Sequence, residues 1–311
     1  MKLHTILGSG GTVSNQLLPI LQQKNERVRL VSRKAQSSTV ESIAADLTNY
    51  EQTQNALRGA DIAYLVVGLS YDVRVWTQAW PKIMTNVINA CKANGTKLIF
   101  FDNVYMYGKV GGIMTEETPF NPTSKKGEIR AAIARQLLDE IKSGHIKAMI
   151  ARAADFYGPV GFSMSAPNML VFGNLRKGKT AQWLINARVP HSFTYVPDTG
   201  KALYMLACTE SAFGQTWHLP TANDPLTGEK FIKEAAKEMN ARDNYSTISK
   251  GMMRLAGLFN RTIKESLEMA YQNEFPYLFD SSKFNKTFRF EPTPYPKGIE
   301  QTARWALAQN N

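Results

Sequence analysis

Three glycines near the amino terminus have the spacing of a loop that binds phosphate. In the segment ILGSGGTVS they follow an apolar stretch, residues 2–7, and precede a stretch with helical spacing, residues 12–24. Glycine permits a tight turn and a close approach of the backbone to a ligand, and the first turn of a helix offers its N–H groups to an anion. The segment therefore predicts a diphosphate site formed by Gly8, Ser9, Gly10, Gly11, Thr12 and Val13, with an ordinary glycine turn as the alternative.

A basic segment follows the second predicted strand, where a dinucleotide-binding unit reads the adenosine end of its ligand. A carboxylate there would bind the ribose 2′-hydroxyl and repel a 2′-phosphate. This chain has Ser32, Arg33 and Lys34 instead. Because arginine forms bidentate hydrogen bonds to phosphate and lysine adds charge, the segment favours NADP as the cofactor, with NAD possible. A solvated basic loop is the alternative.

The elements that position these residues alternate between strands and helices through the first half of the chain. Near-continuous apolar strands separated by helices imply a parallel sheet covered on both faces. The pattern predicts an α/β protein with a doubly wound parallel sheet, a Rossmann fold that binds ligands at the carboxyl ends of its strands. The predicted strands are residues 2–7, 27–32, 40–47, 61–68, 97–103 and 145–155, and the predicted helices are residues 12–24, with a kink at Pro19, 50–58, 73–93 and 126–142.

Beyond residue 155 the segments become longer and richer in Pro, Trp and Tyr. We expect residues 1–155 to form the dinucleotide-binding domain, with some later segments returning to it. Residues 156–311 are expected to form mainly a smaller, mixed lobe that binds a small-molecule substrate.

Composition narrows the classes of partner. The 311 residues carry a formal net charge of +11, but the basic residues are spread out, with no arm or zinc spacing, so the charge favours phosphorylated small molecules over nucleic acid. No apolar run approaches the roughly 20 residues that span a bilayer, and the first residues leave no room for a signal peptide. Cys91 and Cys208 lie in apolar helical patterns, which is typical of buried free thiols. We therefore expect a soluble cytoplasmic protein without metal, membrane or nucleic-acid partners.

Several motifs, in order along nearly the whole chain, resemble the extended short-chain dehydrogenase/reductases. These are the loop GSGGTVS, with Ser14 at the last glycine position, and the segments FFDNVYMYG, RAADFYGP and FTYVPDTGKALYML. The resemblance is to the nucleotide-sugar epimerase/dehydratase group and more closely to its atypical members. It implies that Asp46 and Leu47 contact the adenine, that Val67 and Gly68 lie beneath the nicotinamide ribose, that Ala153 and Asp155 belong to the cofactor site, and that a homodimer could form through the helices at 73–93 and 126–142.

The resemblance also locates the catalytic positions, and all three are replaced. Family members use a Tyr as acid/base, a Lys four residues later that supports it, and a Ser or Thr that orients the substrate oxygen. Here Lys126 stands at the Tyr position, Arg130 at the Lys position and Asn103 at the Ser/Thr position. Arg130 is expected to donate to the nicotinamide ribose, Lys126 to protonate or stabilise a developing alkoxide, and Asn103 to hold a carbonyl oxygen.

Two other assignments for this region stay open. The segment KKGEIRAAIARQLLDEIK is also an amphipathic helix whose charges could face solvent, and Lys126 could bind a ligand without catalysis. Tyr105 and Tyr107 could replace the missing phenol. Tyr105 is the better substitute, and Tyr107 is expected to belong to the scaffold.

Two functions follow from these patterns. The first is an NAD(P)-dependent oxidoreductase or epimerase/dehydratase-like enzyme that moves a hydride to or from a carbonyl or alcohol carbon, with a non-standard proton donor. The second is a non-catalytic NADP-binding redox sensor that regulates a partner. The patterns do not identify the substrate.

Overall fold

The computed structural model describes residues 1–35 and 39–309, and this part of the chain divides into two compact units. The first unit takes in Met1–Met106, Lys125–Arg152 and Thr199–Trp217. The second takes in Tyr107–Ser124, Ala153–Asp198 and the residues from His218 onward. Each unit is therefore assembled from three separate segments of the chain.

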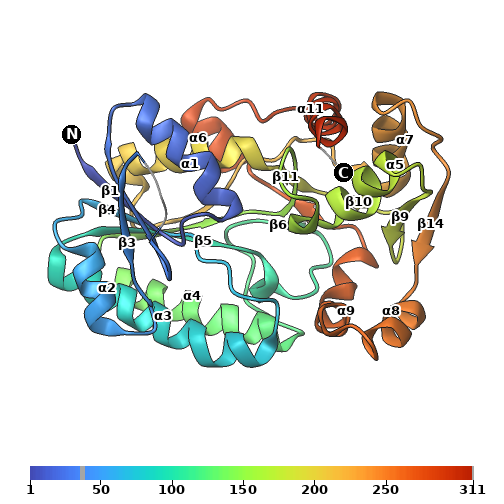
Figure 1. Cartoon of the computed structure of the whole chain (residues 1–311). Coiled ribbons are helices and arrows are strands. Elements are labelled where there is room, and N and C mark those ends of the chain that lie inside the picture. Colours follow the sequence, from blue (N-terminus) through green and yellow to red (C-terminus); the bar gives the residue numbers. More distant parts are fainter. Residues whose placement is uncertain (36–38, 310–311) are drawn as a thin grey trace. The chain divides into compact units, whose positions relative to one another are not determined.

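A seven-stranded sheet forms the centre of the first unit (Figure 1). The strand order is β12-β7-β5-β4-β1-β2-β3, and the five neighbouring pairs from β7 to β3 are parallel. Because the chain goes from β1 to β2 on one side and later returns to β4 on the other, β1 and β4 flank the point where such sheets bind ligands. The predicted doubly wound α/β fold is confirmed. The strands are β1 Leu3–Leu7, β2 Arg27–Ser32, β3 Glu41–Ala44, β4 Ile62–Leu65, β5 Lys97–Asp102, β7 Ala148–Arg152 and β12 Thr216–His218.

Helices cover both faces of this sheet (Figure 1). One face carries α1 (Thr12–Gln23) and α6 (Val196–Cys208), and the other carries α2 (Tyr50–Leu57), α3 (Val73–Asn94) and α4 (Lys125–Lys142). The α1 helix continues through Pro19, which lies on its exposed side. The α6 helix approaches α1 so closely that a side chain at Gly200 would collide with the Gln16 carbonyl. Among the described residues, no helix has both the length and the apolar character needed to cross a membrane.

The strand predicted over residues 145–155 is wrong in its extent. In the structure β7 ends at Arg152, and Asp155–Tyr157 form a separate strand, β8, which pairs with β11 (Phe193–Tyr195) in the second unit. The break has a local cause, because the Ala154 N–H donates to Thr194 Oγ1 at 3.1 Å instead of extending the β7 ladder. The strand predicted over residues 40–47 is likewise reduced to β3, Glu41–Ala44.

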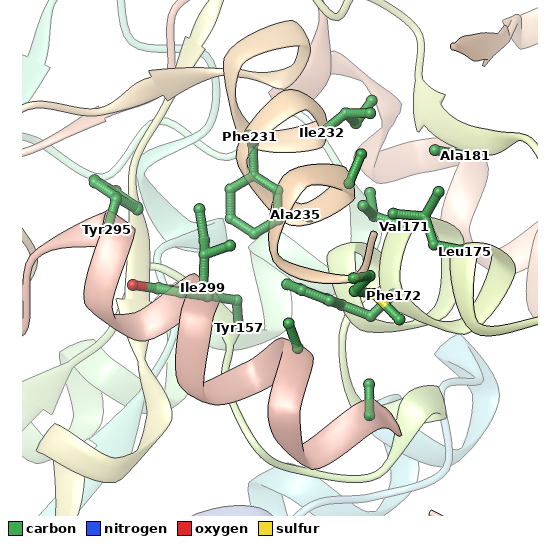
Figure 2. Close-up of a cluster of buried hydrophobic side chains, with 14 of the residues drawn as sticks. Tyr157, Val171, Phe172, Leu175, Ala181, Phe231, Ile232, Ala235, Tyr295 and Ile299 are labelled. Carbon is green, nitrogen blue, oxygen red and sulfur yellow. The ribbon is translucent and has the colours of Figure 1, made fainter. Parts of the chain in front are cut away.

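An aromatic core holds the second unit together. Tyr157 is 1% exposed and packs against Phe193, Phe231 and Tyr295, with ring centroids 5.6–6.3 Å apart. Figure 2 shows this ring beside α11, which carries Tyr295, and near α7, which carries Phe231. The strands of the second unit are β6 Ile113–Met114, β8, β9 Ala181–Leu184, β10 Pro190–His191, β11, β13 Leu226–Thr227, β14 Tyr245–Ile248 and β15 Leu278–Phe279. Its helices are α5 Gly173–Arg176, α7 Gly228–Glu238, α8 Lys250–Gly257, α9 Arg261–Ser266, α10 Ser282–Phe288 and α11 Tyr295–Ala308.

Candidate functional site

The glycine loop joins β1 to α1 at the switch point of the sheet. Gly8 and Gly10 have φ of 106° and 82°, which is left-handed backbone that favours glycine. The N–H groups of Gly8 and Ser9 both donate to the Val31 carbonyl of β2, at 2.9 and 3.0 Å. A Cβ at Gly8 would lie 2.7 Å from Val67 Cα, so the missing side chain lets this loop lie directly against the chain leaving β4.

The N-terminus of α1 has no side-chain cap. Its N-cap residue, Gly11, is extended, and the first turn carries no acidic residue. The first intrahelical bond of the helix runs from the Asn15 N–H to the Gly11 carbonyl at 3.0 Å, so the amides of Thr12, Val13 and Ser14 precede it. These amides and the positive end of the helix dipole fit a diphosphate group. Ser14 is 1% exposed, which shows that the replaced third glycine lies within the packed side of the helix.

The predicted adenosine-binding residues lie at or just beyond the ends of two neighbouring strands, β2 and β3. Ser32 Oγ donates to the Lys34 carbonyl at 2.6 Å and closes a turn that leaves Arg33 and Lys34 exposed. The Thr48 N–H and Oγ1 donate to Asp46 Oδ1 at 2.9 and 2.8 Å. These bonds, with a smaller contribution from the charge of Arg33, lower the pKa of the Asp46 carboxyl.

The remaining predicted cofactor residues differ in exposure. Leu47 is buried, and its carbonyl accepts from Asn86 Nδ2 at 2.9 Å. Val67 is half-buried and Gly68 is exposed, both just beyond the end of β4. Ala153 and Asp155 belong to the second unit, where Asp155 Oδ2 lies 3.0 Å from His191 Nε2. His191 is 2% exposed and stacks on Tyr277 with ring centroids 4.2 Å apart, so it is a packed residue.

A buried ion cluster includes Arg130, which stands at one of the three predicted catalytic positions. Arg130 on α4 donates from Nε to Asp102 Oδ1 at 2.7 Å and also from Nη2, while Arg152 Nε lies 3.6 Å from Asp102 Oδ2. All three side chains are nearly inaccessible to solvent. The Arg130 guanidinium also lies over the rings of Trp80 and Phe100, 4.4 and 5.0 Å from their centroids. Two nitrogens of the Arg130 guanidinium are therefore directed at Asp102. Arg130 is the residue that was expected to donate to the nicotinamide ribose.

Sequence reasoning did not identify Asp102. The available signal was a carboxylate that ends the apolar strand KLIFFD, opposite an arginine that ends the neighbouring strand AMIAR. Such a pair at the carboxyl ends of adjacent parallel strands predicts contact between the side chains.

Lys126 is fully buried, at 0% exposed, so the alternative in which its charge faces solvent is wrong. Its Nζ lies 4.6 Å from the ring centroid of Tyr71, which occupies the loop between β4 and α3. The neighbouring charges of the same helix do face solvent, since Lys125 Nζ pairs with Glu128 Oε2 at 2.9 Å. The first two turns of α4 therefore carry an exposed pair, Lys125 and Glu128, and two buried cations, Lys126 and Arg130.

Tyr105 belongs to a polar and aromatic cluster with Tyr71, whose ring Lys126 contacts. Asn103 Oδ1 accepts from the Tyr105 N–H at 3.0 Å and so fixes the 3₁₀ turn Tyr105–Tyr107. The Tyr71 hydroxyl donates to the Tyr105 hydroxyl at 3.4 Å. Tyr107, in the second unit, is 1% exposed, and its hydroxyl lies 2.8 Å from His218 Nε2, as expected of a scaffold residue. Within the described ranges no cluster of His, Cys, Asp or Glu could hold a metal ion.

The sheet and its glycine loop define a protein of the doubly wound α/β class with a loop of the nucleotide-binding type. The chain belongs to the NAD dependent epimerase/dehydratase family, whose model matches residues 4–217. Among curated proteins no sequence matches it.

Solved structures with the same fold cover nearly the whole chain. The structure is similar to the UDP-glucose 4-epimerase of Thermus thermophilus in complex with NAD, with a TM-score of 0.78 and 15% identity over 98% of this chain and 99% of that one. It is similar to the dTDP-glucose 4,6-dehydratase of Bacillus anthracis in complex with NAD, with a TM-score of 0.80 and 14% identity over 98% and 96%. It is also similar to the UDP-N-acetylglucosamine 4-epimerase of Bacillus cereus, with a TM-score of 0.78 and 15% identity over 98% and 99%. At these identities the similarity establishes the fold.

Proposed function

We propose that the protein is an NAD(P)-dependent enzyme of the epimerase/dehydratase kind that acts on a carbonyl or alcohol carbon of a nucleotide sugar. The observation that carries the proposal is the uncapped N-terminus of α1 behind a left-handed glycine loop, in a chain that belongs to this family. A bound nicotinamide dinucleotide would supply the hydride acceptor or donor. Nucleotide sugars are proposed as substrates because the solved relatives include two UDP-sugar epimerases and a dTDP-glucose dehydratase.

The backbone of the loop is assigned to the diphosphate. Amides from Gly10 to Val13 would donate to its oxygens, while Gly8 and Ser9 hold the loop against β2. At the adenosine end, Leu47 and Asp46 would border the adenine, and Arg33 and Lys34 would bind a 2′-phosphate, which favours NADP over the NAD found in the relatives.

The catalytic positions are assigned by chemistry and proximity. Lys126 would place a positive charge near an oxygen that becomes negative as its carbon is reduced, and Tyr105 would supply the proton. Asn103 accepts the Tyr105 amide through Oδ1, which leaves its NH₂ as the donor for a substrate carbonyl. Arg130, anchored by Asp102, would shape the wall of this site.

Calorimetric titration of the protein with the oxidised and reduced forms of NAD and NADP, followed by nicotinamide absorbance assays with UDP- and dTDP-sugars, tests the proposal. Binding together with turnover of at least one sugar nucleotide is the expected result. Tight binding of the dinucleotide without any turnover would instead support a redox sensor. A folded protein that binds none of the four forms would overturn the proposal.

A further inference from the structure

Tyr71 is a phenol at the candidate site to which no motif assigns a role. It lies three residues beyond Gly68, in the loop that joins β4 to α3, and its side chain is half-buried. Its hydroxyl donates to the Tyr105 hydroxyl at 3.4 Å. Trp76 on α3 contacts both rings, meeting Tyr71 edge-on with centroids 5.8 Å apart and stacking on Tyr105 at 6.3 Å and 14°. Three elements thus hold the two phenols in one orientation.

The direction of the hydrogen bond gives the pair an order. Since Tyr71 donates and Tyr105 accepts, the proton of the Tyr105 hydroxyl is not the one that joins the two phenols. Lys126 contacts the donor of the pair, since its ammonium lies 4.6 Å from the centre of the Tyr71 ring. A nearby cation stabilises a phenolate more than a neutral phenol, and more strongly where solvent is excluded.

Two other charged side chains near this pair, Asp72 and Arg130, have partners of opposite charge. Asp72, next to Tyr71, caps α3 through the Arg74 N–H at 2.9 Å and forms an ion pair with the Arg74 guanidinium at 3.2 Å. Arg130, whose guanidinium lies 5.9 Å from the Trp76 ring, is neutralised by Asp102. The Lys126 ammonium, in contrast, lies over the Tyr71 ring itself.

We propose that Lys126, Tyr71 and Tyr105 form a proton relay that replaces the missing tyrosine of this family. The proposal rests on the proposed function and names how its site moves a proton. When a hydride reaches a carbonyl carbon, the C=O π pair moves to the oxygen, and the Tyr105 O–H proton forms the new O–H bond. Tyr105 takes the Tyr71 proton in turn, and the negative charge comes to rest on Tyr71 beneath the Lys126 ammonium. Solvent returns the proton afterwards, and oxidation of an alcohol runs the same transfers in reverse.

A titration that needs neither cofactor nor substrate tests the relay. Protein labelled at tyrosine ¹³Cζ is followed by NMR against pH for the wild type and for Tyr71→Phe, Tyr105→Phe and Lys126→Met, with Tyr50→Phe on α2 as a matched loss of an unrelated phenol. The resonances missing from the first two variants identify the pair. In Lys126→Met the first ionisation of the pair should move to higher pH by about one unit, because the stabilising cation is gone. An unchanged ionisation in Lys126→Met would overturn the relay.

A second measurement separates this inference from the proposed function. Binding of NAD and NADP to Tyr71→Phe should equal that of the wild type, whereas its kcat with a sugar nucleotide should fall by about 10²-fold with little change in KM. The double variant Tyr71→Phe/Tyr105→Phe should be no slower than Tyr105→Phe alone, because the two phenols act as one unit. Loss of dinucleotide binding by every form, wild type included, would reject the proposed function and leave the ionisation result to decide on the pair. Full kcat in Tyr71→Phe would reject the relay alone.

Discussion

At the scale of single residues, Asp102 is the carboxylate that pairs with two buried arginines in the first unit. One carboxylate faces two guanidinium groups, Arg130 and Arg152, and all three are almost without solvent. Removing charges from water is costly, and the carboxylate offsets that cost for both arginines. The same residue fixes the backbone at the end of β5, since Oδ1 also accepts the Asn103 N–H at 2.8 Å. A buried carboxylate thus orients Asn103 as well as Arg130.

Asp102→Asn should therefore be strongly destabilising. We expect a loss of about 3–5 kcal/mol in the free energy of unfolding, because two buried cations lose their counter-charge. Urea denaturation measures it. The matched control is Glu128→Gln on α4, which removes an exposed carboxylate paired with Lys125 and should cost at most about 1 kcal/mol. Equal effects of the two substitutions would contradict the assigned role of Asp102.

Arg33 is the residue that should decide the choice of dinucleotide. Arg33→Glu should weaken NADP binding by about 10- to 100-fold, because it removes a charge-assisted hydrogen bond to the 2′-phosphate and introduces a carboxylate that repels that phosphate. Binding of NAD should not weaken, because the new carboxylate can accept a hydrogen bond from the ribose 2′-hydroxyl. Calorimetry with both cofactors provides the measurement. Arg27→Glu, at the other end of β2 and also exposed, is the control for the change in net charge. If Arg33→Glu weakens the binding of NAD and NADP equally, the basic segment does not bind the 2′-phosphate.

At the scale of elements, α4 shows how far the sequence pattern reaches. Its helical period was predictable, and the structure extends the helix only by one residue, to Lys125. The pattern did not determine which neighbouring charges turn inward, because Lys125 and Lys126 are chemically identical. That choice depends on Asp102, Tyr71 and the aromatic rings of α3, which come from distant segments. β12 was missed for a similar reason, since three residues are too few to show a strand period.

The contact between α1 and α6 provides a test at this scale. Gly200→Ala adds a methyl group that collides with the Gln16 carbonyl, and it should destabilise the protein by about 1–3 kcal/mol. Because α1 carries the amides proposed to bind the diphosphate, dinucleotide affinity should fall as well. Gly251→Ala on α8 is the control, since its methyl group would make only an ordinary contact with Ser249 Oγ at 3.7 Å and should stabilise the helix by about 0.5–1 kcal/mol. Thermal unfolding and calorimetry distinguish the two variants, and a neutral Gly200→Ala would show that the helices can separate.

At the scale of the whole molecule, the division into units does not follow the order of the chain. The alternation of strands and helices was sufficient to predict the doubly wound sheet. The same alternation does not reveal that Thr199–Trp217 supplies α6 and the edge strand β12 to that sheet, since the contacts they make are far away in sequence. Likewise, the segment Tyr107–Ser124 leaves the first unit between β5 and α4.

A fragment of residues 1–155 should consequently fail to fold as a stable domain. It lacks α6, which packs on α1, and β12, which covers the edge of β7. Circular dichroism against temperature should show no cooperative transition for the fragment and a clear one for the full chain. A fragment that unfolds as sharply as the full chain would show that α6 and β12 are dispensable.

The loop before α1 also bears on how freely this site can change over evolution. Its proposed hold on a ligand consists of main-chain amides, which every amino acid except proline possesses. Replacements at Ser9 or Thr12 should therefore change the affinity for the ligand little. Any side chain at Gly8, in contrast, would have to displace Val67. A compound aimed at these amides could be evaded only by reshaping the loop itself, so resistance to it would come with loss of the natural ligand.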